Sequence, residues 1–126
     1  MTPHEPKLRV LIADDNADAA DTMAALLSIY DYHVAVGYSG SDALALGDAF
    51  HPRAVILDIS MPGMDGCEAT RRIRQRTWGR SACIIALTAW GDDDTRMRAE
   101  LAGMDFYFTK PIKADALLEV LARVLA

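Results

Sequence analysis

The stretch that decides the fold is VILDISMPGMDG, residues 55–66. It begins as a continuous apolar run, which is typical of a strand covered on both faces of a sheet. The run ends on a carboxylate, Asp58, and the chain then turns at Pro62 and Gly63. A buried strand gains no stability from a terminal charge unless that charge has a partner or a chemical role. Asp58 is therefore a candidate functional residue.

Further apolar runs predict the other strands of a sheet. Strands are expected at residues 8–13, 54–58, 82–88 and 106–110, with a weaker one at 33–37. Between them, helical stripes are expected from the apolar spacing; their members are Met23, Leu26, Leu27, Tyr30, Ala43, Leu46, Gly47, Phe50, Leu117, Leu121, Val124 and Leu125.

Polar residues mark where several of these helices begin. Ser39 stands three residues before Asp42, Asp65 stands three before Glu68, and residues 92–94 are all aspartate. Strands that alternate with helices require crossover connections, which favour a parallel sheet. The predicted fold is α/β, with the βα unit repeated five times and helices on both faces of the sheet.

Composition limits the other possibilities. A chain of 126 residues has room for one domain, expected over residues 7–126 after a disordered tail at 1–6. No apolar run approaches the roughly 20 residues of a membrane span, and the N-terminus lacks the apolar core of a secretory signal, so a cytoplasmic protein is expected. The net charge of -5 argues against nucleic acid as a partner. Cys67 and Cys83 lack metal-ligand spacing and are interpreted as reduced thiols.

Reactive side chains follow the predicted strands. Asp14 and Asp15 come after the first, Asp58 ends the third, Thr88 ends the fourth and Lys110 ends the fifth. Ligands of such sheets bind outside the carboxyl ends of the strands. Three carboxylates, a hydroxyl and an ammonium group are thus predicted to meet at one edge.

This set of groups is suited to phosphoryl chemistry. Crowded carboxylates repel one another unless a cation lies among them, and Lys110 supplies only one positive charge. An all-oxygen site of this kind suits Mg²⁺. A metal ion and an ammonium group can offset the charge of a phosphoryl group, which a carboxylate in line can accept as an acyl phosphate.

Four short motifs at these strand ends together resemble the receiver domain of two-component response regulators. They are ADDN (13–16), LDISMPGMDG (57–66), LTA (87–89) and KP (110–111). Within this family the chain is similar to the chemotaxis receivers, and the resemblance covers about residues 7–126. It implies a flavodoxin-like sheet of strand order 2-1-3-4-5. The segments DDNADAADTMAALL (14–27) and LTAWG (87–91) are similar to those of receivers attached to hybrid histidine kinases. A free-standing regulator, a relay intermediate and an excised hybrid-kinase receiver all stay open.

The resemblance implies a role for each acidic residue. Asp58 is the implied phosphorylation site. Asp15 and Asp58 are implied Mg²⁺ ligands, with the backbone carbonyl of Ser60 as a further ligand and Asp14 acting through a bound water. The expected phosphodonor is a sensor histidine kinase or a phosphotransfer protein.

The resemblance also implies switch residues. Thr88 and Lys110 would contact the phosphoryl group, and Tyr107 would move inward with Thr88. The surface of the fourth helix, fifth strand and fifth helix would then change and control an output protein or domain. A cis peptide bond is implied before Pro111.

Two positions, Ser60 and Trp90, correspond to those that tune the lifetime of the phosphoryl group in the family. The indole of Trp90 is large enough to shield an acyl phosphate, so slow self-dephosphorylation is predicted. The alternative is that Trp90 simply lies on the surface of its loop.

The expected switch would not be a turnover enzyme. Three other functions are possible for such a sheet. An aspartyl-phosphate phosphatase usually has a second acid two residues past its nucleophile, where this chain has Ser60. A flavodoxin-like cofactor binder would need backbone amides rather than carboxylates after the first strand. A docking module that is never phosphorylated is the third alternative.

Single residues could also have purely structural roles. Asp14 and Asp15 could cap the first helix. The arginine-rich run at 71–80 is expected to be a solvated helix face on which Glu68 pairs with Arg72. His4, His33 and His51 are expected at the surface or a strand edge, and the aromatic run 106–108 is expected to be mostly core.

Overall fold

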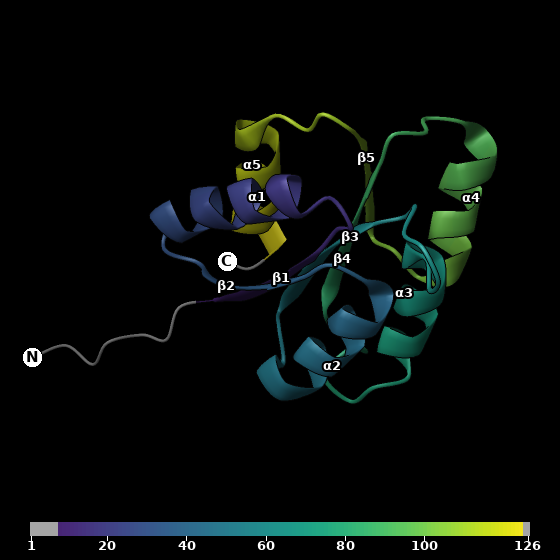
Figure 1. Ribbon diagram of the computed structural model, residues 1–126, viewed down its shortest axis with the longest axis horizontal. Helices are drawn as coiled ribbons and strands as arrows, with labels where there is room; N and C mark the ends of the chain where they lie inside the picture. The colour runs from purple at the N-terminus through teal and green to yellow at the C-terminus, as the bar shows by residue number, and fades with distance from the viewer. Residues whose placement is uncertain (1–7, 125–126) are drawn as a thin grey trace, which may run out of the picture.

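The computed structural model describes residues 8–124, in which strands and helices alternate from β1 to α5 (Figure 1). The strands are β1 (Arg9–Ala13), β2 (His33–Gly37), β3 (Ala54–Asp58), β4 (Cys83–Thr88) and β5 (Phe106–Thr109). The helices are α1 (Ala17–Ile29), α2 (Gly40–Phe50), α3 (Gly66–Arg74), α4 (Asp93–Ala102) and α5 (Ala114–Val124). The tail predicted at 1–6 and the stripe residue Leu125 lie outside the described residues.

The strands form a five-stranded parallel sheet of order β2-β1-β3-β4-β5, which confirms the predicted topology. β3 lies at the centre, between β1 and β4. Its register aligns Asp58 with Leu87 of β4, one residue before Thr88. Parallel pairing therefore brings the carboxyl ends of β1, β3, β4 and β5 to one edge of the sheet.

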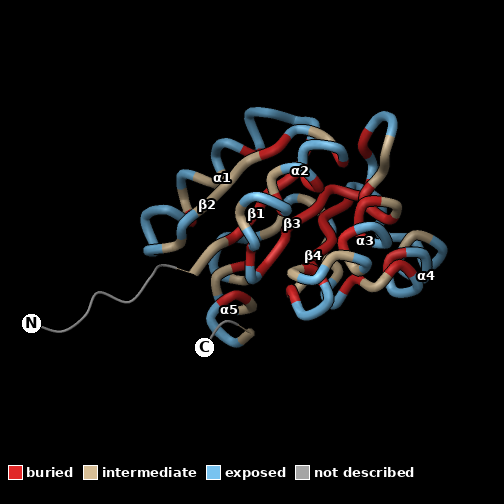
Figure 2. The backbone as a smooth tube through the Cα atoms, turned by 90° about the horizontal axis from the view of Figure 1, so that it is seen from below, coloured by how far each residue is buried: buried red, intermediate tan, exposed pale blue. Residues whose placement is uncertain are grey.

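Helices cover both faces of the sheet (Figure 1). α1 and α5 lie together on one face, where Leu27, Leu117 and Leu121 pack against β1, β3 and β4. α2, α3 and α4 cover the opposite face through residues such as Ala43, Ile73 and Ala99. The buried chain in Figure 2 accordingly runs along the central strands and the inner sides of the helices.

The polar residues expected at helix starts do cap helices. The Ser39 hydroxyl accepts a hydrogen bond from the Asp42 amide at the start of α2, and Asp65 accepts one from the Glu68 amide at the start of α3. Asp92, which precedes the first residue of α4, accepts one from the amide of Thr95. These bonds satisfy amides that have no partner within the helix.

The two edge strands are less buried than predicted. Continuous apolar runs led to the expectation of full coverage, but β2 and β5 each have a neighbour on one side only, and most of their residues are half-buried or exposed. Phe106 is 36% exposed, so the expectation that the run 106–108 is mostly core was wrong for this residue. Tyr30 follows the end of α1 and is 57% exposed, so it does not belong to the buried stripe of that helix.

Among residues 8–124, none of the helices has the length and apolar character needed to cross a bilayer.

Candidate functional site

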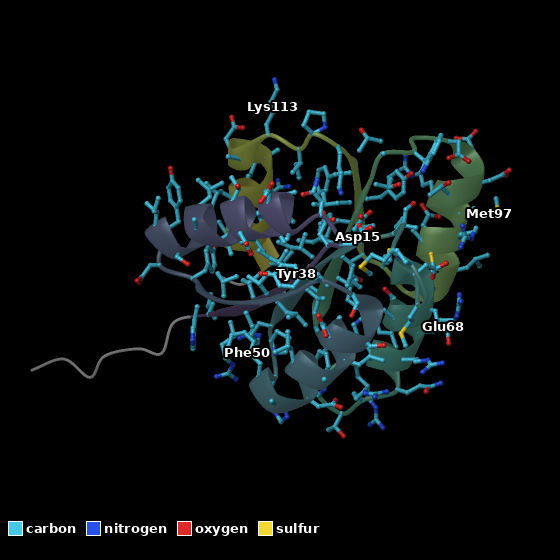
Figure 3. All side chains as sticks on the ribbon, in the orientation of Figure 1. Asp15, Tyr38, Phe50, Glu68, Met97 and Lys113 are labelled. Atoms are coloured by element: carbon cyan, nitrogen blue, oxygen red, sulfur yellow. The ribbon has the colours of Figure 1, made fainter. Side chains whose placement is uncertain are left out.

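Three carboxylates from two strand ends meet at the carboxyl edge of the sheet. Asp14 and Asp15 follow β1, and Asp58 is the last residue of β3. One ligand oxygen from each lies within 4.8 Å of the others. Asp14 and Asp58 are buried, whereas Asp15 is exposed at the mouth of the cluster, beside the start of α1 (Figure 3). The structure thus brings together all three acids predicted from the sequence.

Lys110, just past β5, partly offsets this negative charge. Its ammonium Nζ donates to Asp14 Oδ2 at 2.8 Å and lies 3.3 Å from Asp58 Oδ2. Partial burial opposes the charged form, but the hydrogen bond to Asp14 and the charges of both acids outweigh it and raise the pKa of Lys110. One ammonium group therefore bridges two of the three carboxylates.

The neutralisation of Asp58 is incomplete. Burial, followed by repulsion from Asp14, raises the pKa of Asp58 to about 6, against the opposing effect of Lys110. The Ser60 amide donates to Asp58 Oδ1 at 3.2 Å and fixes the orientation of the carboxylate. The carboxylate of Asp58 is thus fixed in orientation, but its negative charge is not fully neutralised by Lys110. This condition favours the binding of a cation.

The loop after Asp58 closes tightly on β3. The Gly66 amide donates to the Ile59 carbonyl at 2.9 Å, and a Cβ atom at Gly66 would lie 2.5 Å from the Asp58 carbonyl oxygen. Gly63 has a φ of +78°, a conformation that side chains disfavour. Pro62 and Gly63 are exposed. The turn therefore leads the chain away from Asp58 and returns it to begin α3.

Thr88 and Tyr107 are connected through the backbone of one loop residue. Thr88 is fully buried, and its Oγ1 accepts a hydrogen bond from the Trp90 amide at 3.0 Å. The Tyr107 hydroxyl donates to the Trp90 carbonyl. The Trp90 indole itself is exposed (63%), as the alternative interpretation of this residue expected.

The connection between β5 and α5 lies against the site. The Lys110 amide donates to the Thr88 carbonyl at 2.7 Å, and the Lys110–Pro111 peptide bond is cis. A pocket of about 540 Å³ opens beside it, between α1 and the start of α5. Asp14, Asn16 and Lys110 line its polar end, and Met23, Leu26 and Leu117 are among its apolar lining residues.

The start of α1 has a cap other than the two neighbouring aspartates. α1 is capped by Asn16, whose side chain accepts from the Ala19 amide, so neither Asp14 nor Asp15 serves as its cap. Asn16 is the last residue of the ADDN motif, and no role was predicted for it. Asp14 instead accepts from the Asn16 amide at 2.9 Å, which orients its carboxylate.

The arginine-rich run 71–80 is a solvated face only in part. Glu68 pairs with Arg72 at 2.9 Å and with Arg71 at 3.0 Å, and these three side chains are between 38% and 54% exposed. For Arg74 the expectation was wrong, because its side chain is only 22% exposed and its guanidinium donates to the carbonyls of Gly79, Ala82 and Gly103 and to Asp105 Oδ2.

His33 and His51 are exposed, His33 on the edge strand β2; His4 lies outside the described residues. Both cysteines are free, and burial raises the pKa of Cys83 to about 11, which keeps this thiol protonated.

Comparison with known proteins identifies the family. The family model described as response regulator receiver domain matches residues 10–122. Protein PilH of Pseudomonas aeruginosa is 30% identical over 94% of this chain and 98% of its own length. The virulence sensor protein BvgS of Bordetella bronchiseptica is 37% identical, and the match spans 99% of this chain but 11% of BvgS.

Solved structures agree with this relationship. The chemotaxis protein CheY4 of Vibrio cholerae superposes with a TM-score of 0.89, at 25% identity over 94% of this chain and 98% of CheY4. A putative response regulator from Chloroflexus aurantiacus superposes with a TM-score of 0.87 at 30% identity, over 94% of this chain and 98% of that one. Because the family model covers most of the chain and the strand order and acidic edge agree with it, this chain belongs to the response regulator receiver domain family.

Proposed function

We propose that this chain is a phosphorylation-dependent switch whose Asp58 accepts a phosphoryl group from a histidine kinase or a phosphotransfer protein. The observation that carries the proposal is the set of groups at one sheet edge. A buried carboxylate at the end of the central strand lies beside a second acid and an ammonium group that contacts both. Membership of the receiver family supports this assignment.

The transfer step is a direct displacement at phosphorus. A carboxylate oxygen of Asp58 forms the new O–P bond while the P–N bond to a phosphohistidine of the partner breaks. The imidazole leaves with the bonding electron pair and takes up a proton from water. Lys110 now contacts Asp58 and would contact the phosphoryl oxygens after transfer. The buried Thr88 hydroxyl would donate to another of these oxygens.

The acidic cluster fits a divalent cation by the chemistry of its donors. Three carboxylates within reach of one another and only one ammonium group leave a net negative charge, and hard oxygen donors suit Mg²⁺. Asp15, Asp58 and the Ser60 carbonyl would hold the ion, with Asp14 acting through water. When bound, Mg²⁺ would offset charge on the phosphoryl oxygens.

The output surface is proposed to be formed by α4, β5 and α5. Met97 and Leu101 on α4 are 60% and 82% exposed, and Phe106 begins β5 at 36%; Met97 lies on the outer side of its helix (Figure 3). Exposed apolar residues of this size on one side of a domain are typical of a protein-binding surface. A downstream protein or an attached domain is the proposed partner, in the cytoplasm.

The proposal is tested by chemical phosphorylation. Purified protein incubated with acetyl phosphate and Mg²⁺ should gain the mass of one phosphoryl group, and Asp58→Ala should gain none. Asp94→Ala removes an exposed carboxylate of α4 and is the matched control that should still be phosphorylated. Failure of the unaltered protein to gain mass, or labelling of Asp58→Ala, would contradict the proposal.

The alternative enzyme, an aspartyl-phosphate phosphatase, predicts turnover of added phosphoesters. The proposed switch predicts a stable label without such turnover. The phosphatase would need an acidic side chain two residues past Asp58. This chain has Ser60 there, and the Ser60 amide donates to Asp58. This position favours the switch over the enzyme.

We further propose that Trp90 lengthens the lifetime of the phosphoryl group by restricting access of water. Trp90→Ala should shorten the half-life of the phosphorylated protein, measured by loss of the added mass with time. An unchanged half-life would refute the shielding role. Trp78→Phe changes a tryptophan in the α3–β4 connection and should leave the half-life unchanged.

A further inference from the structure

The turn from β2 into α2 contacts the loops on both sides of the acidic cluster, although it contributes no acid to that cluster. Residues 37–42 are called the β2–α2 turn below. Its first residue, Gly37, pairs in register with Ala13, the last residue of β1. The Gly37 carbonyl accepts a hydrogen bond from the Asp14 amide at 3.2 Å. One end of the turn is therefore bonded to the backbone of the first acid.

The other end of the turn lies against the loop that follows Asp58. Gly40, the first residue of α2, is buried, and a Cβ atom there would lie 2.6 Å from the Met64 carbonyl oxygen and 2.9 Å from Met64 Cβ. Carbon atoms that are not bonded to each other rest at about 3.5–4.0 Å. The carbonyl oxygen belongs to the backbone and cannot rotate aside as the end of a long side chain can. A side chain at residue 40 would therefore displace either the loop or the start of α2.

Hydrogen bonds hold the β2–α2 turn in one shape. Ser39 Oγ accepts from the Asp42 amide at 3.0 Å, and Asp42 Oδ2 accepts from the Tyr38 amide at 3.0 Å. The Tyr38 hydroxyl donates to Asp21 of α1 at 2.7 Å, and Tyr38 accordingly lies between α1 and α2 (Figure 3). A Cβ atom at Gly37 would lie 2.8 Å from Cβ of Asp42, so the turn is also closely packed. It has little freedom to deform internally.

The loop that contains Met64 is constrained as well. The Gly66 amide donates to the Ile59 carbonyl at 2.9 Å, which closes the loop at its base. Within the closed segment, the Ser60 amide donates to Asp58 Oδ1. Met64 is half-buried and packs on the core beneath the loop. A displacement of its backbone is therefore passed on to the residues that orient Asp58.

We infer that Gly40 is a positioning residue, which lets the β2–α2 turn set the spacing between the Asp14 side and the Asp58 side of the acidic cluster. If a side chain at residue 40 displaced Met64, the Asp58 side would shift. If it displaced the start of α2 instead, Gly37 would shift and move the Asp14 backbone with it. Either displacement changes how the carboxylates of the two sides face each other.

The consequence of such a change is weaker binding of Mg²⁺, which demands near-ideal ligand geometry. This consequence rests on the proposed function, whereas the contacts of Gly40 do not. Groups that orient metal ligands contribute roughly 10- to 100-fold to metal affinity. Gly40→Ala should therefore raise the Kd for Mg²⁺ by roughly 10-fold or more, as measured by isothermal titration calorimetry.

Gly47→Ala is the matched control. It places the same methyl group in the same helix, where it would lie 2.3 Å from the Trp78 ring. Both substitutions force a collision in α2, so general destabilisation affects both variants. Only Gly40→Ala should weaken Mg²⁺ binding. An unchanged Kd in Gly40→Ala, or equal weakening in both variants, would overturn the inference.

A second variant loosens the turn without adding a methyl group, and it serves if Gly40→Ala does not fold. Asp42→Ala removes the carboxylate that accepts from the Tyr38 amide. It should raise the Kd for Mg²⁺, whereas Asp94→Ala, which removes an exposed carboxylate of α4, should change it by less than twofold. Equal Kd values for these two variants would show that the turn does not position the cluster.

A measurement without Mg²⁺ separates the inference from the proposed function. In metal-free protein, NMR should show a shifted amide signal of Asp14 or Ser60 in Gly40→Ala and of neither residue in Gly47→Ala. Unchanged signals of both amides in Gly40→Ala would overturn the inference even if Mg²⁺ binds. If the unaltered protein neither binds Mg²⁺ nor gains a phosphoryl group, the proposed function fails, and the amide signals still decide whether Gly40 positions the cluster.

Discussion

Asp58 occupies a position that is unfavourable for its own ionised form. Its side chain is buried, a second carboxylate lies beside it, and one lysine serves both. An apolar or amide side chain would be more stable at the same place. An unfavourable ionised group of this kind is kept where function requires it. The residue is therefore expected to cost stability in the absence of a bound cation.

The pH dependence of this cost follows from the raised pKa of Asp58, about 6 against 3.8 for an ordinary aspartate. Below about pH 4 both the folded and unfolded states hold the proton. Between about pH 4 and 6 the unfolded state has released it and the folded state has not, so the contribution of Asp58 to stability falls as pH rises through this window. Asp58→Asn should therefore stabilise the metal-free protein by about 1–3 kcal/mol at pH 8.

Urea unfolding in EDTA between pH 4 and 8 measures this difference. The gain from Asp58→Asn should shrink toward zero at the acidic end, while Asp94→Asn, an exposed control, should show no such trend. A gain that is the same at pH 4 and pH 8 would contradict the assigned cause.

Thr70 offers a second test at the scale of one residue. It is fully buried in α3, and its hydroxyl has no hydrogen-bond partner within residues 8–124. A buried hydroxyl without a partner costs about 1–3 kcal/mol of desolvation. Thr70→Val, which keeps the shape and removes the hydroxyl, should raise the free energy of unfolding by about 1 kcal/mol, as measured by urea denaturation. Thr70→Ser keeps the hydroxyl and loses a methyl group, so it should instead destabilise; stabilisation by Thr70→Ser would refute the explanation.

At the scale of elements, α2 and the loop after α3 are joined by close packing between Gly47 and Trp78. A Cβ atom at Gly47 would lie 2.3 Å from the indole ring. Trp78 Nε1 donates to Asp48 Oδ1 at 2.9 Å, and Arg76 donates to the same oxygen at 3.2 Å. The glycine in the middle of α2 is thus explained by the side chain that covers it.

Gly47→Ala should destabilise the protein by about 1–3 kcal/mol, because the indole must move and lose its bond to Asp48. In a Trp78→Ala background the same change should instead stabilise by up to about 1 kcal/mol, since alanine favours a helix over glycine. A double-mutant cycle of thermal or urea unfolding measures this reversal of sign. Equal effects in both backgrounds would show that Trp78 is not the cause.

Most strands and helices, and the acidic edge of the sheet, could be predicted from the sequence. Strand positions, helix starts and the acidic edge follow from apolar runs, short polar motifs and parallel topology, so Asp14, Asp15 and Asp58 were expected together. The exposure of Phe106 was not, because a single apolar run does not reveal whether its strand is central or at an edge. The resemblance implied that Thr88 and Tyr107 act together, but the two hydrogen bonds that connect them escaped prediction, because the backbone of Trp90 makes them and they do not depend on its side chain.

At the scale of the whole molecule, binding of Mg²⁺ should be visible as stability. A ligand that binds only the folded state stabilises it by about 3 kcal/mol at a hundredfold excess over its dissociation constant. The melting temperature should therefore rise with Mg²⁺ concentration. Asp15→Asn should abolish most of the rise, whereas Asp18→Asn, an exposed acid of α1 outside the cluster, should retain it. A rise that survives in Asp15→Asn would place the ion elsewhere.

The central position of β3 has a consequence for measurement. All five of its residues are buried, and it pairs with a strand on each side. Its amide protons can reach solvent only when the domain opens as a unit, so their hydrogen–deuterium exchange reports the global free energy of unfolding. The strand that carries Asp58 is thus an internal reference, against which slower or faster exchange in the loop around Trp90 can be read in a single spectrum.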